Sequence, residues 1–240
     1  HLIRERGIPP TRILAVTFTN KAAHEMRERV EELVGAQARA LTLGTFHSVC
    51  ARTLRREGHR IDIPPDFSIY DTDDQRALVR RIEREIQVDP RQFSPRSVLS
   101  AISAAKNEQI DALAYAHTVG TYHEEIVARV YERYEHMLRQ SRAVDFDDLL
   151  LLVVRLFDKH PKARQTHAER YLHILVDEFQ DTNLVQYRLL RQLASIHSNI
   201  TAVGDPDQSI YSWRAADVRN LQNFQRDFPD TRLVLLEQNY

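Results

Sequence analysis

The sequence predicts an α/β fold in which a parallel sheet carries a helical segment inserted between its second and third strands. Short apolar runs of strand length stand at residues 13–18, 41–43, 173–176 and 200–203. Stretches with helical spacing separate them, and this alternation is typical of a parallel sheet covered by helices. The stretch from 65 to about 168 shows helical periodicity only, which predicts the insertion.

The amino-terminal part should supply the first two strands. Pro9-Pro10 ends a short initial helix, and residues 13–18 form a buried strand because they are apolar and partly β-branched. Asn20 is a suitable N-cap for the helix that follows. Residues 41–43 form the second strand, and residues 44–48 turn into another helix.

The middle of the chain carries clear helix-start signals. Thr72 opens a helix with a capping box, and Ser94-Pro95 places proline at a first helical position. Residues 123–141 read as one long, charged helix, and Asp145 opens the next one. We therefore expect the insertion to be all helical.

Strands return in the last third of the chain. Residues 173–176 and 200–203 flank a helix over 184–194. A further helix is predicted over 216–228, and a fifth strand over 233–236. The chain then divides into a first part of the sheet domain (1–65), the helical insertion (66–168) and a second part of the sheet domain (169–240).

Composition narrows the class of protein. The chain has 240 residues with a formal net charge of −1, so no overall basic charge points to nucleic acid, although a basic groove could still exist. Cys50 is the single cysteine, which excludes an internal disulfide framework and favours a reducing, cytoplasmic location. No apolar run approaches the ~18–20 residues of a membrane span. The first residues read as the tail of a helix, so we expect a fragment of a longer protein.

An acidic pair follows the strand at 173–176. Asp177 and Glu178 at the end of a buried strand can hold a hydrated Mg²⁺ and polarise a water molecule. The alternative is an acidic pair that only stabilises the start of a helix. The first interpretation makes this stretch half of a nucleotide-hydrolysis site.

Several ordered motifs carry a family resemblance. They are Thr17-Phe18-Thr19-Asn20-Lys21-Ala22-Ala23, Gly44-Thr45-Phe46-His47-Ser48, Asp177-Glu178-Phe179-Gln180-Asp181-Thr182, Gly204-Asp205-Pro206-Asp207-Gln208-Ser209-Ile210-Tyr211-Ser212-Trp213-Arg214 and the closing Gln238-Asn239-Tyr240. Together they resemble the UvrD/PcrA/Rep family of superfamily 1 DNA helicases along the whole chain. The resemblance implies a P-loop NTPase (RecA-like) parallel sheet that lacks its first strand, an all-helical insertion domain, and ATP with Mg²⁺ as cofactors.

One family motif is missing from this sequence. The family's phosphate loop ends in Gly-Lys-Ser/Thr, whereas no glycine here precedes a lysine. The family places that loop upstream of His1 and a second RecA-like domain downstream of Tyr240. We therefore expect the fragment to lack ATPase activity by itself.

The resemblance implies roles for residues at the nucleotide site. Asp177 resembles the Mg²⁺ carboxylate and Glu178 the residue that orients or activates the attacking water. Gln208 resembles the sensor of the γ-phosphate. Asp205 and Arg214 would tie this loop to the nucleotide, or form an ordinary salt bridge. Tyr240 matches the family's adenine-stacking tyrosine.

Aromatic residues after the strands point to a track for single-stranded DNA. Stacking grips every base without reading it, because all bases have a π-face. Family positions along this path match Phe18, Phe146, Tyr211 and Trp213, while Thr45 and His47 resemble contacts to the DNA backbone. Core packing is the alternative for Phe18 and Trp213, but their place at a strand end or in the loop beyond it favours a binding role. For Phe146 both interpretations stay open.

The resemblance implies a helicase that couples ATP hydrolysis to 3′-to-5′ movement on single-stranded DNA and to unwinding at duplex/single-strand junctions, with repair or replication proteins as partners. Two alternatives stay open. One is a non-enzymatic module that binds single-stranded nucleic acid or docks a partner through the helical segment. The other is the ATPase half of a helicase–nuclease.

Overall fold

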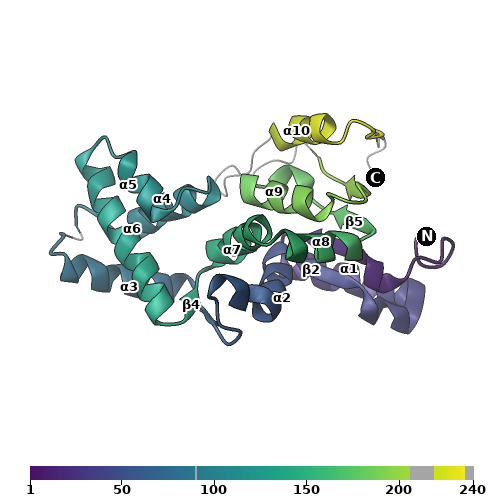
Figure 1. The fold of residues 1–240 in the computed structure, drawn as a ribbon, viewed down its shortest axis with the longest axis horizontal. Coiled ribbons are helices and arrows are strands. Elements are labelled where there is room, and N and C mark those ends of the chain that lie inside the picture. The colour runs from purple at the N-terminus through teal and green to yellow at the C-terminus, as the bar shows by residue number, and fades with distance from the viewer. Residues whose placement is uncertain (90, 206–218, 236–240) are drawn as a thin grey trace.

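A parallel sheet and a helical segment beside it make up the computed structural model, which describes residues 1–89, 91–205 and 219–235 (Figure 1). The main sheet has the strand order β2-β1-β5-β6, with every pairing parallel. Its strands are β1 (Ile13–Thr17), β2 (Thr42–Thr45), β5 (His173–Val176) and β6 (Ile200–Ala202). The predicted α/β class with a parallel sheet is confirmed, and β5 begins and ends at the predicted residues.

Helices surround this sheet and extend away from it. They are α1 (Asn20–Val34), α2 (Phe46–Glu57), α3 (Thr72–Glu85), α4 (Pro95–Asn107), α5 (Ala112–His117), α6 (Tyr122–Gln140), α7 (Phe146–Lys159), α8 (Pro161–Arg170), α9 (Leu184–Leu193) and α10 (Arg219–Asp227). Short 3₁₀ turns stand at Pro10–Arg12, Gly35–Ala40, Gly58–Ile61 and Phe179–Asp181. No helix in these described ranges combines the length and the apolar character needed to cross a membrane.

The central strand β1 is buried along its whole length, and its side chains alternate between two cores. Leu14 and Val16 belong to the larger core, which α2, α7 and α9 cover. Ile13 and Ala15 belong to a smaller core on the other face, against which α1 packs. Helices pack on both faces of β1, and in sheets of this kind ligands bind at the carboxyl ends of the strands.

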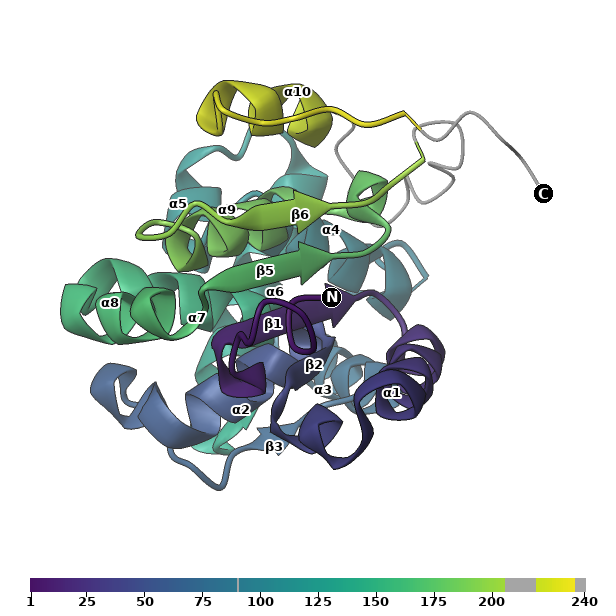
Figure 2. The ribbon, with the colours of Figure 1, turned by 90° about the vertical axis from the view of Figure 1, so that its right-hand side faces the viewer.

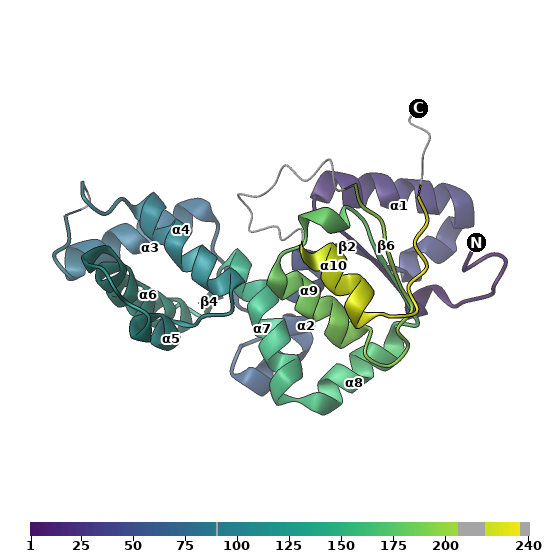
Figure 3. The same ribbon diagram turned by 90° about the horizontal axis from the view of Figure 1, so that it is seen from above.

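The helical segment lies beside the sheet in Figure 3. It has a core of its own. Its most buried members come from α3, α4 and α6 and include Ile82, Ile102 and Tyr134, each at most 1% exposed. The apolar side chains of α7 lie instead in the larger core under the sheet. The boundary at 66–168 therefore stays a prediction, with α7 shared between the predicted insertion and the sheet.

Two predicted helix starts need correction by one residue. Thr19, not Asn20, is the N-cap of α1, and its hydroxyl accepts from the Ala22 amide. Asp71, not Thr72, caps α3 in a capping box with Asp74. In both places neighbouring residues could each cap a helix, and sequence alone does not choose between them. The predicted starts at Ser94 and Asp145 are confirmed.

The segment from 66 to 168 is not all helical, contrary to the prediction. Two short strands, β3 (Ser68–Ile69) and β4 (Ala143–Val144), pair in parallel at the base of the helical segment. Strands of this length show no alternation that a sequence pattern could reveal. They bring the two ends of the α3–α6 segment side by side.

Two further elements differ from the predictions. Residues 2–6 form a turn that ends at Gly7, whose φ is 64°, rather than the tail of a helix. Residues 233–235 form no strand, and Leu233, Val234 and Leu235 are 67%, 64% and 70% exposed. An apolar run becomes a strand only where a neighbouring strand accepts its hydrogen bonds. Residue 236 lies outside the described ranges.

A buried ion cluster lies where the helical segment meets α7. The Lys106 ammonium of α4 is 2.7 Å from Asp145 Oδ2, 2.7 Å from Asp148 Oδ1 and 2.8 Å from Glu135 Oε1. The hydroxyl of Tyr134 donates to Asp145 at 3.0 Å. A single buried cation thus holds three carboxylates from two other segments.

An amide bridge continues from this cluster toward the sheet. Asn107, the last residue of α4, donates to Asp147 at 3.3 Å. Its carbonyl oxygen accepts from the side chain of Asn183 at 2.5 Å. Asn183 caps α9, which follows the acidic motif of β5 directly. The helical segment is therefore connected by hydrogen bonds to the residues behind the candidate site.

Candidate functional site

The carboxyl ends of the four main strands meet at one edge of the sheet, where the strand arrows point in Figure 2. Thr17, Thr45 and Asp177 end or follow their strands there, and Asp205 follows β6 after a short link. Backbone hydrogen bonds extend the ladder past β5, with Asp177 N donating to Val16 O at 3.0 Å. The predicted residues on different strands are thus brought to a common edge.

Asp177 stands beside the end of the central strand. The buried Thr17 hydroxyl donates to Asp177 Oδ2 at 3.4 Å, which joins the ends of β1 and β5. Among the described residues, no group of three or more His, Cys, Asp or Glu side chains could hold a metal by itself. One half-buried carboxylate next to a hydroxyl fits a hydrated Mg²⁺ that takes its remaining ligands from water and a nucleotide's phosphates.

Glu178 has a strained backbone and an exposed side chain. Its φ of 51° and ψ of 44° lie in the left-handed region, where a non-glycine residue costs roughly 1–2 kcal/mol. Such strain persists only where surrounding contacts enforce it, and it gathers at functional sites. The bend turns the chain from β5 into the 3₁₀ turn Phe179–Asp181.

Gln180 connects the ends of β5 and β6. Its side-chain nitrogen donates to Glu178 Oε2 at 2.8 Å, and its side-chain oxygen accepts from the Asp205 amide at 3.1 Å. Gly204 makes room for this contact, because a Cβ at that position would lie 2.5 Å from Gln180 Oε1. The side chain of Gln180, which is buried, therefore bridges the turn after β5 and the loop after β6.

On the proposed DNA side, Phe18 and Thr45 are partly committed to the fold. The Phe18 ring is half-buried, with its centroid 5.5 Å from that of Phe46. Thr45 is 6% exposed, and its hydroxyl accepts from the Ser48 amide at 3.2 Å as the N-cap of α2. Core packing accounts for much of the Phe18 surface, while one part of the ring stays accessible.

His47 and Phe146 come together from different helices. Their ring centroids are 6.0 Å apart in an edge-to-face arrangement, at the first turns of α2 and α7. Phe146 is 44% exposed, which is high for a phenylalanine that opens a helix with a buried face. These two residues, which lie 99 apart in the sequence by their numbers, thus form one partly exposed aromatic surface.

The remaining predicted site residues are Gln208, Tyr211, Trp213, Arg214 and Tyr240, and they lie outside the described ranges. Sequence reasoning assigned no role to Thr17, Gln180 or Gly204. All three stand inside the quoted motifs, so the signal was present. Their contacts depend on which strands are neighbours, which a motif does not state.

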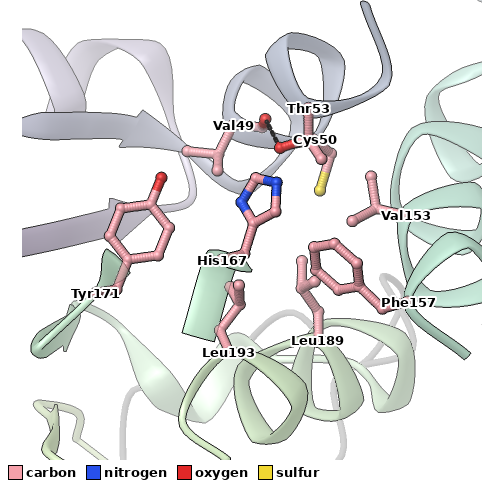
Figure 4. A pocket seen from close by; sticks show the side chains of 9 residues that line it. All are labelled: Val49, Cys50, Thr53, Val153, Phe157, His167, Tyr171, Leu189 and Leu193. Atoms are coloured by element: carbon pink, nitrogen blue, oxygen red, sulfur yellow. Dashed lines mark hydrogen bonds between the residues drawn. The ribbon is translucent and has the colours of Figure 1, made fainter. Parts of the chain in front are cut away.

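An internal cavity lies elsewhere, among α2, α7, α8 and α9, and none of the site residues lines it (Figure 4). Burial raises the pKa of the Cys50 thiol in its wall, so this cysteine stays protonated. Burial also lowers the pKa of His167, whose Nε2 lies 2.7 Å from Glu57 Oε1. The lining is mostly apolar, and the cavity is a gap in the core.

Comparisons with known proteins agree with the motifs. Residues 1–229 match the model of the UvrD/REP helicase N-terminal domain. The whole chain is 45% identical to the ATP-dependent DNA helicase PcrA of Bacillus subtilis (strain 168), of which it covers 32%. It is 42% identical to the ATP-dependent DNA helicase PcrA of Staphylococcus aureus (strain Mu50), of which it covers 33%.

The chain thus spans about a third of the length of these relatives. The match runs through both the sheet and the helical segment, so it does not rest on the acidic motif alone. Taken with the parallel sheet and the residues at its edge, it shows that this chain belongs to the UvrD/REP helicase N-terminal domain family.

Proposed function

We propose that this chain is part of the motor of an ATP-dependent DNA helicase, a RecA-like sheet domain that carries a helical insertion. The observation that carries the proposal is the joined end of β1, β5 and β6. There Thr17 contacts Asp177, and Gln180 holds Glu178 beside the loop at Asp205. The sequence match to helicases supports the same reading.

The adjacent carboxylates of Asp177 and Glu178 would have different roles in ATP hydrolysis. Asp177 would hold the Mg²⁺ that comes with ATP, and the metal would supply charge neutralisation at the phosphates. Glu178, whose carboxylate accepts from Gln180, would orient and activate the attacking water. Asp205, Gln208 and Arg214 would connect this site to the following loop, and Tyr240 would stack on adenine.

Single-stranded DNA would run across the same edge of the sheet. Phe18 and the paired rings of His47 and Phe146 offer partly exposed aromatic surface there. Thr45 is buried, so its contribution would come through the backbone at the start of α2. Tyr211 and Trp213 would extend this track, which makes the loop after β6 a shared boundary between nucleotide and DNA.

The chain holds no phosphate loop, because none of its glycines precedes a lysine. We therefore propose that the segment alone does not hydrolyse ATP, whereas a full-length protein that contains it does. That protein would move 3′ to 5′ along single-stranded DNA and unwind duplexes from single-strand junctions, in repair or replication.

The test uses the full-length protein and the segment side by side. We expect DNA-stimulated ATP hydrolysis by the full-length protein, and its loss in Glu178→Gln with nucleotide binding retained. The segment should show no turnover above the Glu178→Gln background. Duplexes with a 3′ or a 5′ single-strand tail then report direction, and unwinding only from the 5′ tail would refute the proposed polarity.

A further inference from the structure

Gln180 is a buried polar side chain at the carboxyl edge of the sheet. It is 2% exposed, yet both ends of its amide are used by groups at the candidate site. Its nitrogen donates to Glu178 Oε2 at 2.8 Å, and its oxygen accepts from the Asp205 amide at 3.1 Å. We propose that Gln180 is a positioning residue that sets the Glu178 carboxylate for catalysis and couples it to the loop after β6. The inference rests on the proposed function.

The partners fix the orientation of the amide. A carboxylate accepts hydrogen bonds, so the side-chain nitrogen must face Glu178. A backbone amide donates, so the side-chain oxygen must face Asp205. No other side chain of this length presents a donor and an acceptor side by side. Glutamate would set a second carboxylate against Glu178, and asparagine is one methylene too short to reach both partners.

The hydrogen bond from Gln180 restricts a Glu178 side chain that would otherwise be free to rotate. Glu178 sits in the left-handed region with its side chain exposed, so neither helix packing nor burial restricts its rotamers. A hydrogen bond to one carboxylate oxygen holds the group and leaves the other oxygen to face a water. A general base must lie within hydrogen-bond reach of the water it activates, and small misplacements cost large factors in rate.

The other half of the bridge gives the residue a second role. The Asp205 amide belongs to the loop that continues toward Gln208, the predicted γ-phosphate sensor. A displacement of that loop would pull on the oxygen of Gln180 and so shift the nitrogen that holds Glu178. The position of the base would thereby depend on the loop that borders the DNA track. Gly204 supports this contact, since the Gln180 oxygen occupies the space of a Cβ.

The experiment measures steady-state ATP hydrolysis by the full-length protein in four variants. Gln180→Met keeps length and loses both hydrogen bonds, and Gln180→Glu replaces the donor by a carboxylate. Gly204→Ala places a methyl group against the Gln180 side-chain oxygen and so displaces the amide. Gln192→Met is the matched control, because Gln192 is buried and hydrogen-bonds Asp158 at 2.8 Å away from the sheet edge. Thermal unfolding and binding of a fluorescent ATP analogue are followed in parallel.

We expect kcat to fall roughly 10- to 100-fold in Gln180→Met, with KM for ATP changed less than about threefold. Gly204→Ala should show the same pattern more weakly, and Gln192→Met should match the wild type in kcat. Gln180→Glu should lose kcat as Gln180→Met does, because a carboxylate at position 180 cannot donate to Glu178. A purely structural role for Gln180 would lower thermal stability without this loss of kcat at nearly constant KM.

The outcomes separate the two proposals. A wild-type protein without ATP hydrolysis, or one that Glu178→Gln leaves active, refutes the proposed function. Given a wild-type protein that Glu178→Gln inactivates, unchanged kcat in Gln180→Met overturns the positioning role. If Gln180→Met does not fold, Gly204→Ala and Gln180→Glu decide, and a kcat loss explained fully by lost nucleotide binding also overturns it.

Discussion

Replacing Lys106 by methionine should destabilise the joint between the helical segment and α7. The Lys106 side chain is fully buried, and its ammonium lies within 2.8 Å of oxygens from three carboxylates. Burial opposes the charge on Lys106, but the carboxylates of Asp148, Asp145 and Glu135 still hold its pKa well above the usual value. Methionine has a similar length and brings no charge, so the substitution tests the charge itself.

The expected magnitude follows from the carboxylates that stay behind. Removing one partner of a buried ion pair costs about 3–5 kcal/mol, because the other charge is left buried without compensation. Here the cation serves three carboxylates, of which Asp145 is 3% exposed in its side chain and Asp148 9%. We therefore expect the free energy of unfolding to fall by the upper part of that range, about 4–5 kcal/mol, at about pH 8.

Acid should restore part of this loss. Burial, together with the Asp145 carboxylate, raises the pKa of Asp148 to about 8 and that of Asp147 to about 6. A carboxyl whose pKa is raised in the folded state keeps its proton there while the unfolded chain has lost it. Its contribution to stability is therefore present at low pH and declines as pH rises from about 4 to about 8. Protonated carboxyls need no cation, so the deficit of Lys106→Met should shrink toward about pH 5.

Urea denaturation followed by far-ultraviolet circular dichroism gives the free energies of unfolding of the wild type and of Lys106→Met at each pH. Lys162→Met is the control, because Lys162 is exposed on α8 and its loss should cost less than about 0.5 kcal/mol. A loss below about 1 kcal/mol in Lys106→Met at about pH 8 would refute the reasoning. So would a deficit that is equal at both pH values.

Further predictions concern single side chains. Phe46→Ala should lower the free energy of unfolding by about 3–5 kcal/mol in urea denaturation, because Phe46 is 2% exposed. Phe146→Ala should cost less stability, because the ring is 44% exposed, and should weaken single-stranded DNA binding by the full-length protein in fluorescence anisotropy. Asn183→Ala should cost about 1 kcal/mol or more through loss of the α9 cap, measured by thermal unfolding. Burial lowers the pKa of His167 despite the Glu57 carboxylate, so the protein should lose stability as pH falls below about 6.5 and the unfolded chain takes up the proton. In urea denaturation, His167→Gln should make the free energy of unfolding less dependent on pH in this range.

The strands could be predicted where burial leaves a pattern in the sequence. The run at 173–176 is apolar and bounded by acid, so β5 was predicted to the residue. The run at 233–236 is equally apolar, yet its described part forms no strand, because strand formation depends on a hydrogen-bonding neighbour. The two-residue pair of β3 and β4 gave no pattern at all. Local sequence therefore predicts burial well and pairing poorly.

At the candidate site, too, the sequence predicts individual residues better than the contacts between them. Asp177 and Glu178 could be singled out because adjacent acids at the end of a buried strand can hold Mg²⁺ and polarise a water, and because they stand in an ordered motif. The contact of Thr17 with Asp177 joins residues 160 apart in the sequence, and it exists only because β1 lies next to β5. Gln180 could be quoted within a motif, but its bond to the Asp205 amide required the position of β6. Spatial neighbours decide which motif residues work together.

Helix α7 contacts both the helical segment and the edge of the sheet, and so connects the two. Its apolar side chains lie in the core under the sheet, while Asp145 and Asp148 at its start hold Lys106 of the helical segment. The same first turn sets Phe146 against His47 at the proposed DNA track. Hydrogen bonds and ion pairs weaken steeply when their geometry is distorted, so this joint resists rotation more than an apolar contact would. A rotation of the helical segment must therefore either break the Lys106 cluster or move the start of α7, and with it the exposed aromatic ring.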